Sequence, residues 1–356
     1  MSGSSQDINS GTTAVREQYR FDEARLENWM QAHVEGYEGP LAIEQFKGGQ
    51  SNPTYKIVTP RRSYVLRRKP SNATAKTAHA VDREARIQQA LAGTGVPVAR
   101  IHGLCTDESV IGSWFYVMDY LEGRIVWDAR FPDVPRDKRP LYFDEMNRVI
   151  AELHRIDYAA LGLTDYGRAG NYFERQIGRW DRQYTADVDV AGRNPHLERL
   201  IEWLPKHIPP GDEVSIAHGD FRCDNLIFHP TEPKVIAVLD WELSTIGHPL
   251  ADFTYHAMMY RMPPLLIAGL DGVDLNKWNI PTEQEYIASY CRRTGREGIS
   301  ELGFYFAFNM FRLATIIHGI KARMARGTAA SAHANKLVEA LPLLSERAWT
   351  IALQEG

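Results

Sequence analysis

The stretch that decides the fold of this 356-residue chain is HGDFRCDN, residues 218–225, followed by KVIAVLDWE, residues 234–242. Asp220 in the polar loop can accept a proton from a substrate hydroxyl. Asn225, in the same loop, and Asp240, at the end of the strand-like run, offer the hard oxygen ligands that Mg²⁺ prefers. Phosphoryl transfer needs this combination, because its catalysis is mostly positioning and charge neutralisation.

Other residues of the two segments receive structural assignments. A loop rich in Asp and Asn can also be a simple turn or helix cap, but the Asp at the end of the following strand favours the catalytic interpretation. We expect His218 to shape the loop and Cys223 to fill a packing position. Glu242 could assist a second metal or make a loop contact, and the sequence leaves both options open.

The octet also resembles a family motif. H-G-D-x-x-x-x-N has the spacing of the protein-kinase pattern H-R-D-x-x-x-x-N, with Gly219 in place of Arg. The HGD form resembles the aminoglycoside phosphotransferase and choline kinase branch, in which LDWE takes the place of D-F-G. GHPLADF (247–253) resembles the segment that follows the metal-binding Asp in the same branch. NYFERQIGRW (171–180) and FYFAFNMFRLATIIHGI (304–320) are most similar to phosphotransferases related to the domains attached to some acyl-CoA dehydrogenases.

The resemblance implies an α+β, two-lobed protein-kinase-like fold, with a small antiparallel-sheet N-lobe and a larger, mostly helical C-lobe. The residue pattern agrees. Between residues 21 and 123, the strand-like runs LAIEQF, TYKIVT, SYVLRR, VARIHGLC and SWFYVMDYL accompany two helical stretches. We expect a disordered tail over residues 1–20, a nucleotide-binding lobe over 21–123 and an acceptor-binding lobe over 124–356. Gly123 would let the chain turn between the lobes.

The first lobe contains candidates for a nucleotide site. In FKGGQSN (46–52), Gly48 and Gly49 let backbone N–H groups approach phosphate oxygens, and Ser51 and Asn52 add polar donors. A Gly-Gly pair between two strands is otherwise a turn. Aligned on the kinase V-A-I-K strand, SYVLRRKP puts the phosphate-binding cation at Arg67, where Lys is usual.

The resemblance extends to the partner of this cation and to the adenine seat. Glu84 on the next helix would orient Arg67. Backbone groups of Asp119, Tyr120 and Leu121 would hold the adenine, and Met118 would form an apolar wall.

The acceptor is expected to bind the helical lobe. Asp252, His256 and Tyr260 recur every four residues, which puts them on one helix face. Asp252 would brace the catalytic loop, while His256 and Tyr260 could line the acceptor pocket or simply pack. Arg312, on an otherwise apolar helix, needs either an internal carboxylate or an anionic substrate group.

Composition limits the function classes. A net charge of -4 gives no general attraction to nucleic acid or anionic membrane, and no apolar run is long enough to span a bilayer. The polar N-terminus lacks the apolar core of a secretory signal, so the cytoplasm is the expected compartment. We expect ATP, or GTP, with Mg²⁺ as cofactor.

The acceptor would be a hydroxylated small molecule. A hydroxy acid or hydroxyacyl-CoA fits a helical lobe that is not acidic, since residues 250–330 contain nine Lys and Arg against seven Asp and Glu. Aminoglycoside or choline phosphorylation is the alternative. A nucleotide-binding pseudokinase without turnover is the alternative from another class, and the residues do not specify an oligomeric state.

Overall fold

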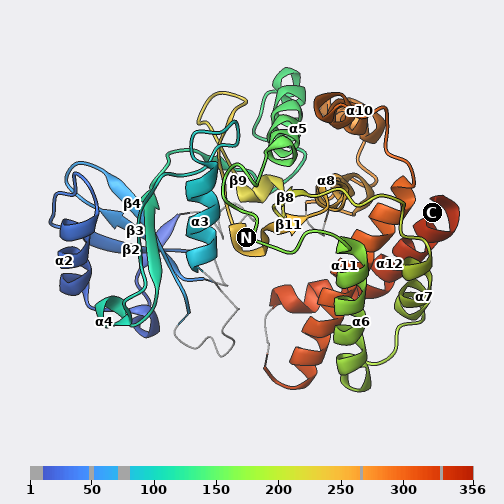
Figure 1. Cartoon of the computed structure of the whole chain (residues 1–356), viewed down its shortest axis with the longest axis horizontal. Coiled ribbons are helices and arrows are strands. Elements are labelled where there is room, and N and C mark those ends of the chain that lie inside the picture. The colour runs from blue at the N-terminus through green and yellow to red at the C-terminus, as the bar shows by residue number, and fades with distance from the viewer. Residues whose placement is uncertain (1–10, 48–51, 71–80, 265–267, 329–331, 356) are drawn as a thin grey trace. The chain divides into compact units, whose positions relative to one another are not determined.

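A six-stranded antiparallel sheet organises the first part of the chain, in the order β1-β2-β3-β4-β6-β5 (Figure 1). The computed structural model describes residues 11–47, 52–70, 81–264, 268–328 and 332–355. The chain divides into two structural units. The first comprises residues up to 127, with 159–166 and 223–244, and the second comprises 128–158, 167–222 and 245–356.

The sheet of the first unit has a helix on each face, α2 (Glu23–His33) and α3 (Val81–Leu91) (Figure 1). The remaining sheet strands are β1 (Thr12–Ala14), β2 (Ala42–Phe46), β3 (Thr54–Val58), β4 (Ser63–Arg68), β5 (Ile101–Cys105) and β6 (Phe115–Asp119). Side chains alternate across β4, so that Tyr64 and Leu66 pack in the core that includes α2. Val65 packs instead with Val81 and Ala85 of α3. The same alternation directs Arg67 toward α3, where a charged partner is available.

The N-terminal segment differs from the prediction. Thr12–Ala14 form β1, which pairs with β2 at the edge of the sheet, and Thr12 Oγ1 donates a 2.6 Å hydrogen bond to Glu44. A disordered tail through residue 20 is therefore wrong for this part, because partners 32 residues further along the chain order it. Residues 1–10 lie outside the described part of the chain.

A small three-stranded sheet belongs to the first unit as well. It joins β7 (Arg124–Ile125), β9 (Leu226–Phe228) and β10 (Val235–Val238). A Cβ added to Gly123 would lie 2.6 Å from the Phe228 carbonyl oxygen, so this glycine permits close approach of the strands. The segment 223–244 thus packs with the first unit, although the predicted boundary assigned it to the C-terminal lobe.

The second unit is mostly helical. Its long helices are α5 (Arg139–Arg155), α6 (Tyr172–Ala191), α7 (Pro195–Trp203), α8 (Pro249–Ala257), α10 (Glu283–Thr294), α11 (Leu302–Ala325) and α12 (Ala332–Glu355). The N-terminal half of α11 is buried on all sides, as its continuous apolar sequence predicts. Within the described residues, no helix has the length and hydropathy needed to cross a bilayer.

Two short strands place the functional loop. β8 (Ser215–Ala217) pairs antiparallel with β11 (Thr245–Gly247), so the segments that leave these two strands are anchored to the same small sheet. His218 follows β8 directly, and α8 follows β11 after His248, whose ring accepts a hydrogen bond from the Leu250 N–H as the helix N-cap.

Candidate active site

The segment His218–Asn225 is called the catalytic loop below, and its residues 218–222, which belong to the second unit, are held by one face of α8. Asp252 accepts 2.7 Å hydrogen bonds from the backbone N–H groups of His218 and Gly219, one on each carboxylate oxygen. One turn further, His256 pairs through Nδ1 with the carbonyl of Phe221 at 3.2 Å. Because residues four apart share one face of a helix, Asp252 and His256 bind the loop from the same side of α8.

Asp252 is buried, and its charge is compensated inside the protein. Burial by itself would raise the pKa of this carboxyl. The interactions with His154 and with His218, including the His218 backbone N–H, nevertheless hold the pKa below its ordinary value. His154 Nε2 lies 3.1 Å from Oδ2 of Asp252, and its Nδ1 lies 2.7 Å from the hydroxyl of Tyr290. The backbone of the loop is thus bound by a buried carboxylate, which His154 of α5 holds in place with the support of Tyr290 of α10.

The carboxylate of Asp220 is oriented by two donors. The Tyr255 hydroxyl donates a 2.8 Å hydrogen bond to Oδ1, and Nε of Arg222 lies 3.2 Å from the same oxygen. Burial, followed by the charge of Asp220, raises the pKa of Tyr255, so the phenol remains a proton donor. A carboxylate held in one orientation is suited to orient or deprotonate a hydroxyl.

The cation predicted on β4 forms a buried ion cluster in the first unit. Arg67 Nε lies 2.7 Å from Glu84 and Nη2 lies 2.7 Å from Asp240, while Glu242 is 3.5 Å away. Burial would lower the pKa of Arg67, but the charges of these carboxylates raise it above its ordinary value, so the guanidinium stays charged. The planar fork of Arg suits contacts with several carboxylates.

Glu84 is held by more than Arg67. The Asn52 side chain donates a 2.9 Å hydrogen bond to Oε1, and the Tyr116 hydroxyl donates one of 3.1 Å to Oε2. Asn52 is fully buried and its amide serves this carboxylate, and its role in phosphate binding stays a prediction. The other members of the predicted phosphate loop, Gly48, Gly49 and Ser51, lie outside the described residues.

The two predicted metal ligands come together through the backbone. The N–H of Leu239 donates a 2.8 Å hydrogen bond to the Asn225 carbonyl, which places Asn225 beside Asp240. Asp240 has a left-handed backbone (φ 62°), a conformation that Asp and Asn adopt more readily than most residues. An amide and a carboxylate oxygen fit Mg²⁺, which usually binds one or two carboxylates and completes its shell with phosphate and water.

The predicted adenine seat lies at the end of β6. Met118 is buried on the same face of the sheet as Val65. Asp119 is fixed by His102 Nε2 at 2.7 Å and by its own N–H, which donates to the Arg100 carbonyl. Tyr120 and Leu121 pack partly buried against the same cluster as Met118, and Lys56 Nζ lies 4.2 Å from the Tyr120 ring centroid.

Three predicted acceptor residues have different environments. His256 is buried, and its second nitrogen lies 2.7 Å from the Tyr286 hydroxyl, so both ring nitrogens are engaged within the protein. Tyr260 is buried beyond the end of α8, in a 3₁₀ turn. These environments favour the packing alternative for both residues, and their role in lining the acceptor pocket stays a prediction. Arg312 is half-buried and donates to the Gly219 carbonyl at 2.8 Å.

The remaining assignments concern the loop itself. His218 is fully buried, and its Nδ1 accepts from the Asp220 N–H at 3.2 Å, which bends the loop. Cys223 is buried in the 3₁₀ turn that ends the loop. Sequence reasoning missed Tyr255, Arg222, His154 and Tyr116. The spacing of Tyr255 three residues after Asp252 was the available signal, since the two share a helix face.

Residues 42–297 match the phosphotransferase enzyme family known as APH. The mouse protein named acyl-CoA dehydrogenase family member 10 is 40% identical over 348 residues, which are 97% of this chain and 32% of that protein. The chain spans 32% of the length of this relative and 44% of the length of chicken acyl-CoA dehydrogenase family member 11.

Solved structures show the same architecture. A Ralstonia eutropha protein provisionally named an aminoglycoside phosphotransferase is 49% identical, with a TM-score of 0.88, covering 95% of this chain and 100% of that one. A thermostable mutant of aminoglycoside phosphotransferase APH(4)-Ia, in complex with AMP-PNP and hygromycin B, has a TM-score of 0.55 at 14% identity, covering 92% and 97%. The predicted α+β kinase-like fold is confirmed, and the chain belongs to the APH phosphotransferase family.

Proposed function

We propose that this phosphotransferase moves the terminal phosphate of ATP to a hydroxyl of a small molecule, with a hydroxy acid or a hydroxyacyl-CoA as acceptor. The observation that carries the proposal is the anchoring of the catalytic loop by α8. It leaves the Asp220 carboxylate oriented by Tyr255 and Arg222 rather than buried as a structural cap. In-line transfer depends on such positioning.

Each charged residue then has a defined role. Asp220 orients the acceptor hydroxyl and accepts its proton as the oxygen attacks phosphorus. Arg67 contributes positive charge for the nucleotide phosphates, and Glu84 holds it in position. Asn225 and Asp240 would hold Mg²⁺, which neutralises charge on the phosphate oxygens.

The nature of the acceptor is inferred from charge and from relatives. Aminoglycosides and choline are cationic and would favour acidic or aromatic surroundings. Asp252, which accepts hydrogen bonds from the loop backbone, is buried and committed to those bonds. The curated relatives include acyl-CoA dehydrogenase family members, which supports an acceptor of acyl chemistry. An aminoglycoside remains the second candidate because of the name of the Ralstonia eutropha protein.

Release of ADP from Mg²⁺ATP, measured against a panel of acceptors, tests the proposal. The panel contains 3-hydroxybutyrate, 3-hydroxybutyryl-CoA, choline, a sugar and an aminoglycoside, and Asp220→Asn is the control. We expect one hydroxylated acid or thioester to stimulate turnover that the substitution abolishes. Tight nucleotide binding without stimulated turnover would favour a pseudokinase, and turnover unchanged in Asp220→Asn would refute the role of Asp220.

A further inference from the structure

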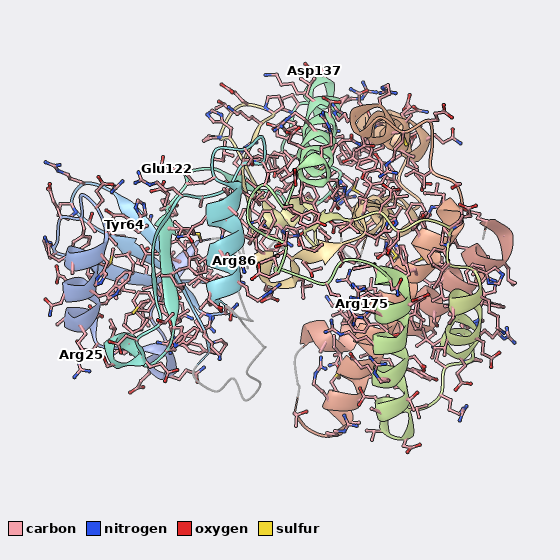
Figure 2. The ribbon with its side chains drawn as sticks, viewed as in Figure 1. Arg25, Tyr64, Arg86, Glu122, Asp137 and Arg175 are labelled. Atoms are coloured by element: carbon pink, nitrogen blue, oxygen red, sulfur yellow. The ribbon has the colours of Figure 1, made fainter. Side chains whose placement is uncertain are left out.

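Three arginines of the second unit lie around the phenol of Tyr172. Arg175 and Arg179 follow Tyr172 on α6 at spacings of three and seven residues, so they share its helix face. Arg312 comes from α11, which packs along α6 and brings Phe308, one turn before Arg312, to 6.4 Å from the Tyr172 ring. Burial raises the pKa of the Tyr172 phenol, and the charge of Asp252 adds to this, whereas the charges of Arg312, Arg175 and Arg179 lower it. Figure 2 shows Arg175 near the beginning of α6.

These arginines, called the arginine cluster below, form no ion pair with a carboxylate in the described part of the chain, although the charges of Asp212 and Glu174 act on Arg175. Arg261 of the same unit, in contrast, pairs with both Glu283 and Glu355. Arg175 and Arg179 lie four residues apart on α6, a spacing at which like charges repel, and an anion bound beside them would relieve this repulsion.

Arg175 carries the clearest unsatisfied donor. Its Nη2 donates to the Arg168 carbonyl, whereas Nη1 is buried and has no hydrogen-bond partner among the described residues. Burial, followed by the charge of Arg168, lowers the pKa of Arg175. A buried N–H group without a partner costs free energy, which a bound carboxylate or phosphate would recover.

The cluster begins next to the catalytic carboxylate. The Arg312 guanidinium lies 4.9 Å from the centroid of the Tyr255 ring, and the hydroxyl of that ring is 2.8 Å from Asp220. Arg312 also donates to the carbonyl of Gly219, next to Asp220 in the loop. One tyrosine ring therefore separates the first cation of the cluster from the group that would receive the acceptor hydroxyl.

We propose that the arginine cluster binds an anionic group of the acceptor, a carboxylate or a phosphate, while the acceptor hydroxyl lies at Asp220. The assignment of the bound molecule as the acceptor rests on the proposed function. Arg312 would reach an anionic group close to the hydroxyl, and Arg175 and Arg179 one further along the molecule. The guanidinium fork matches both carboxylate and phosphate. The cluster would at the same time disfavour polycationic acceptors such as aminoglycosides.

Equilibrium binding to the full chain, saturated with Mg²⁺ and AMP-PNP, tests the proposal without requiring turnover. The saturated nucleotide keeps the probes out of the nucleotide site. In each of two pairs of probes, one member carries an anionic group that the other lacks: 3-hydroxybutyrate against 1,3-butanediol, and 3-hydroxybutyryl-4′-phosphopantetheine against 3-hydroxybutyryl-pantetheine. The first pair reports a carboxylate and the second a phosphate. We expect the anionic member of at least one pair to bind about tenfold more tightly than its neutral partner.

The variants separate the cluster from general effects of charge. Arg175→Gln with Arg179→Gln should reduce the preference for the anionic probe to less than about threefold. Arg312→Gln should reduce this preference most strongly for 3-hydroxybutyrate. Arg312→Lys keeps the positive charge and should therefore retain part of the preference. Arg199→Gln is the control, because Arg199, like Arg312, lies over an aromatic ring, that of Trp349, but belongs to α7 and forms no hydrogen bond or ion pair with a described residue of the catalytic loop.

The outcomes are distinct. Equal binding of charged and neutral probes, or binding of none of the four, overturns the proposal, as does an unchanged preference in the cluster variants. Weaker AMP-PNP binding in these variants, with acceptor binding intact, would assign the arginines to the nucleotide and also overturn it. A charge preference without phosphorylation of any probe would refute the proposed function and leave the anion site standing.

Discussion

The phenol of Tyr255 donates a 2.8 Å hydrogen bond to Oδ1 of Asp220, from a position three residues after Asp252 on α8. The same helix therefore fixes the backbone of the catalytic loop through Asp252 and the side chain of its central carboxylate through Tyr255. Since Tyr255 is buried and its pKa is raised, this donor persists throughout the neutral pH range. The orientation of the Asp220 carboxylate is therefore set by α8 as well as by the loop itself.

Tyr255→Phe should lower kcat about tenfold, because the Asp220 carboxylate loses one of the donors that set its orientation. The ring remains beneath Arg312, so the KM of the nucleotide should not change. A double-mutant cycle with Asp220→Ala, measured by chemical unfolding, should give a coupling of about 1–3 kcal/mol. Tyr260→Phe is the control, because its buried hydroxyl has no hydrogen-bond partner among the described residues. Zero coupling would contradict the orienting role.

Arg67→Met should lower the free energy of unfolding by about 3–5 kcal/mol, because it leaves Glu84 as an uncompensated buried charge. Adding Glu84→Gln to this variant should restore part of the loss. Arg61→Met provides the comparison, since Arg61 pairs with Glu38 on the surface and should cost less than about 1 kcal/mol. Similar losses for both single variants, measured by denaturant titration, would show that the Arg67 cluster is not energetically distinct.

Acid should destabilise the chain through two buried histidines of the second unit. Burial lowers the pKa of His248 and that of His256 to about 4, from an ordinary value of 6.5. Below about pH 6.5 the unfolded chain binds protons that the folded chain does not, so the free energy of unfolding falls until about pH 4. Each histidine should contribute up to about 3 kcal/mol.

Denaturant titrations between pH 7.5 and pH 4, taken as about one point per half unit, measure this dependence. His256→Gln should flatten the curve, whereas substitution of the exposed His207 should leave its slope unchanged. An identical slope in His256→Gln would exclude His256 as a source of the acid sensitivity.

Asp240→Asn should weaken binding of AMP-PNP in the presence of Mn²⁺ at least about tenfold, because one charged ligand becomes neutral. The fold should survive, since Asn tolerates the left-handed backbone that Asp240 adopts. Asp240→Ala should instead also lose about 1 kcal/mol of stability to backbone strain. Electron paramagnetic resonance of bound Mn²⁺, with nucleotide present, measures the effect directly. Unchanged Mn²⁺ affinity in Asp240→Asn would remove Asp240 from the metal site.

Much of the secondary structure could be predicted because its signals are local. The alternation in SYVLRR predicted β4 and placed Val65 and Arg67 on one face of the sheet, and the continuous apolar run predicted a buried α11. The Arg67 and Glu84 pair could also be predicted, from the family resemblance and the order of strand and helix. The edge strand β1 could not, because its order depends on pairing with β2, a distant segment.

The sequence by itself determined which groups of the site are available: the HGDFRCDN loop, the Asp that ends the next strand, and a cation on β4. Only the tertiary structure decided how they are held. Tyr255 reaches Asp220 because β8 and β11 pair, and Asn52 donates to Glu84 because the fold brings the residues just before β3 to α3. Residue types and their spacing can be read directly from the sequence. Hydrogen-bond partners depend instead on contacts between distant segments, because burial of the core determines which segments meet.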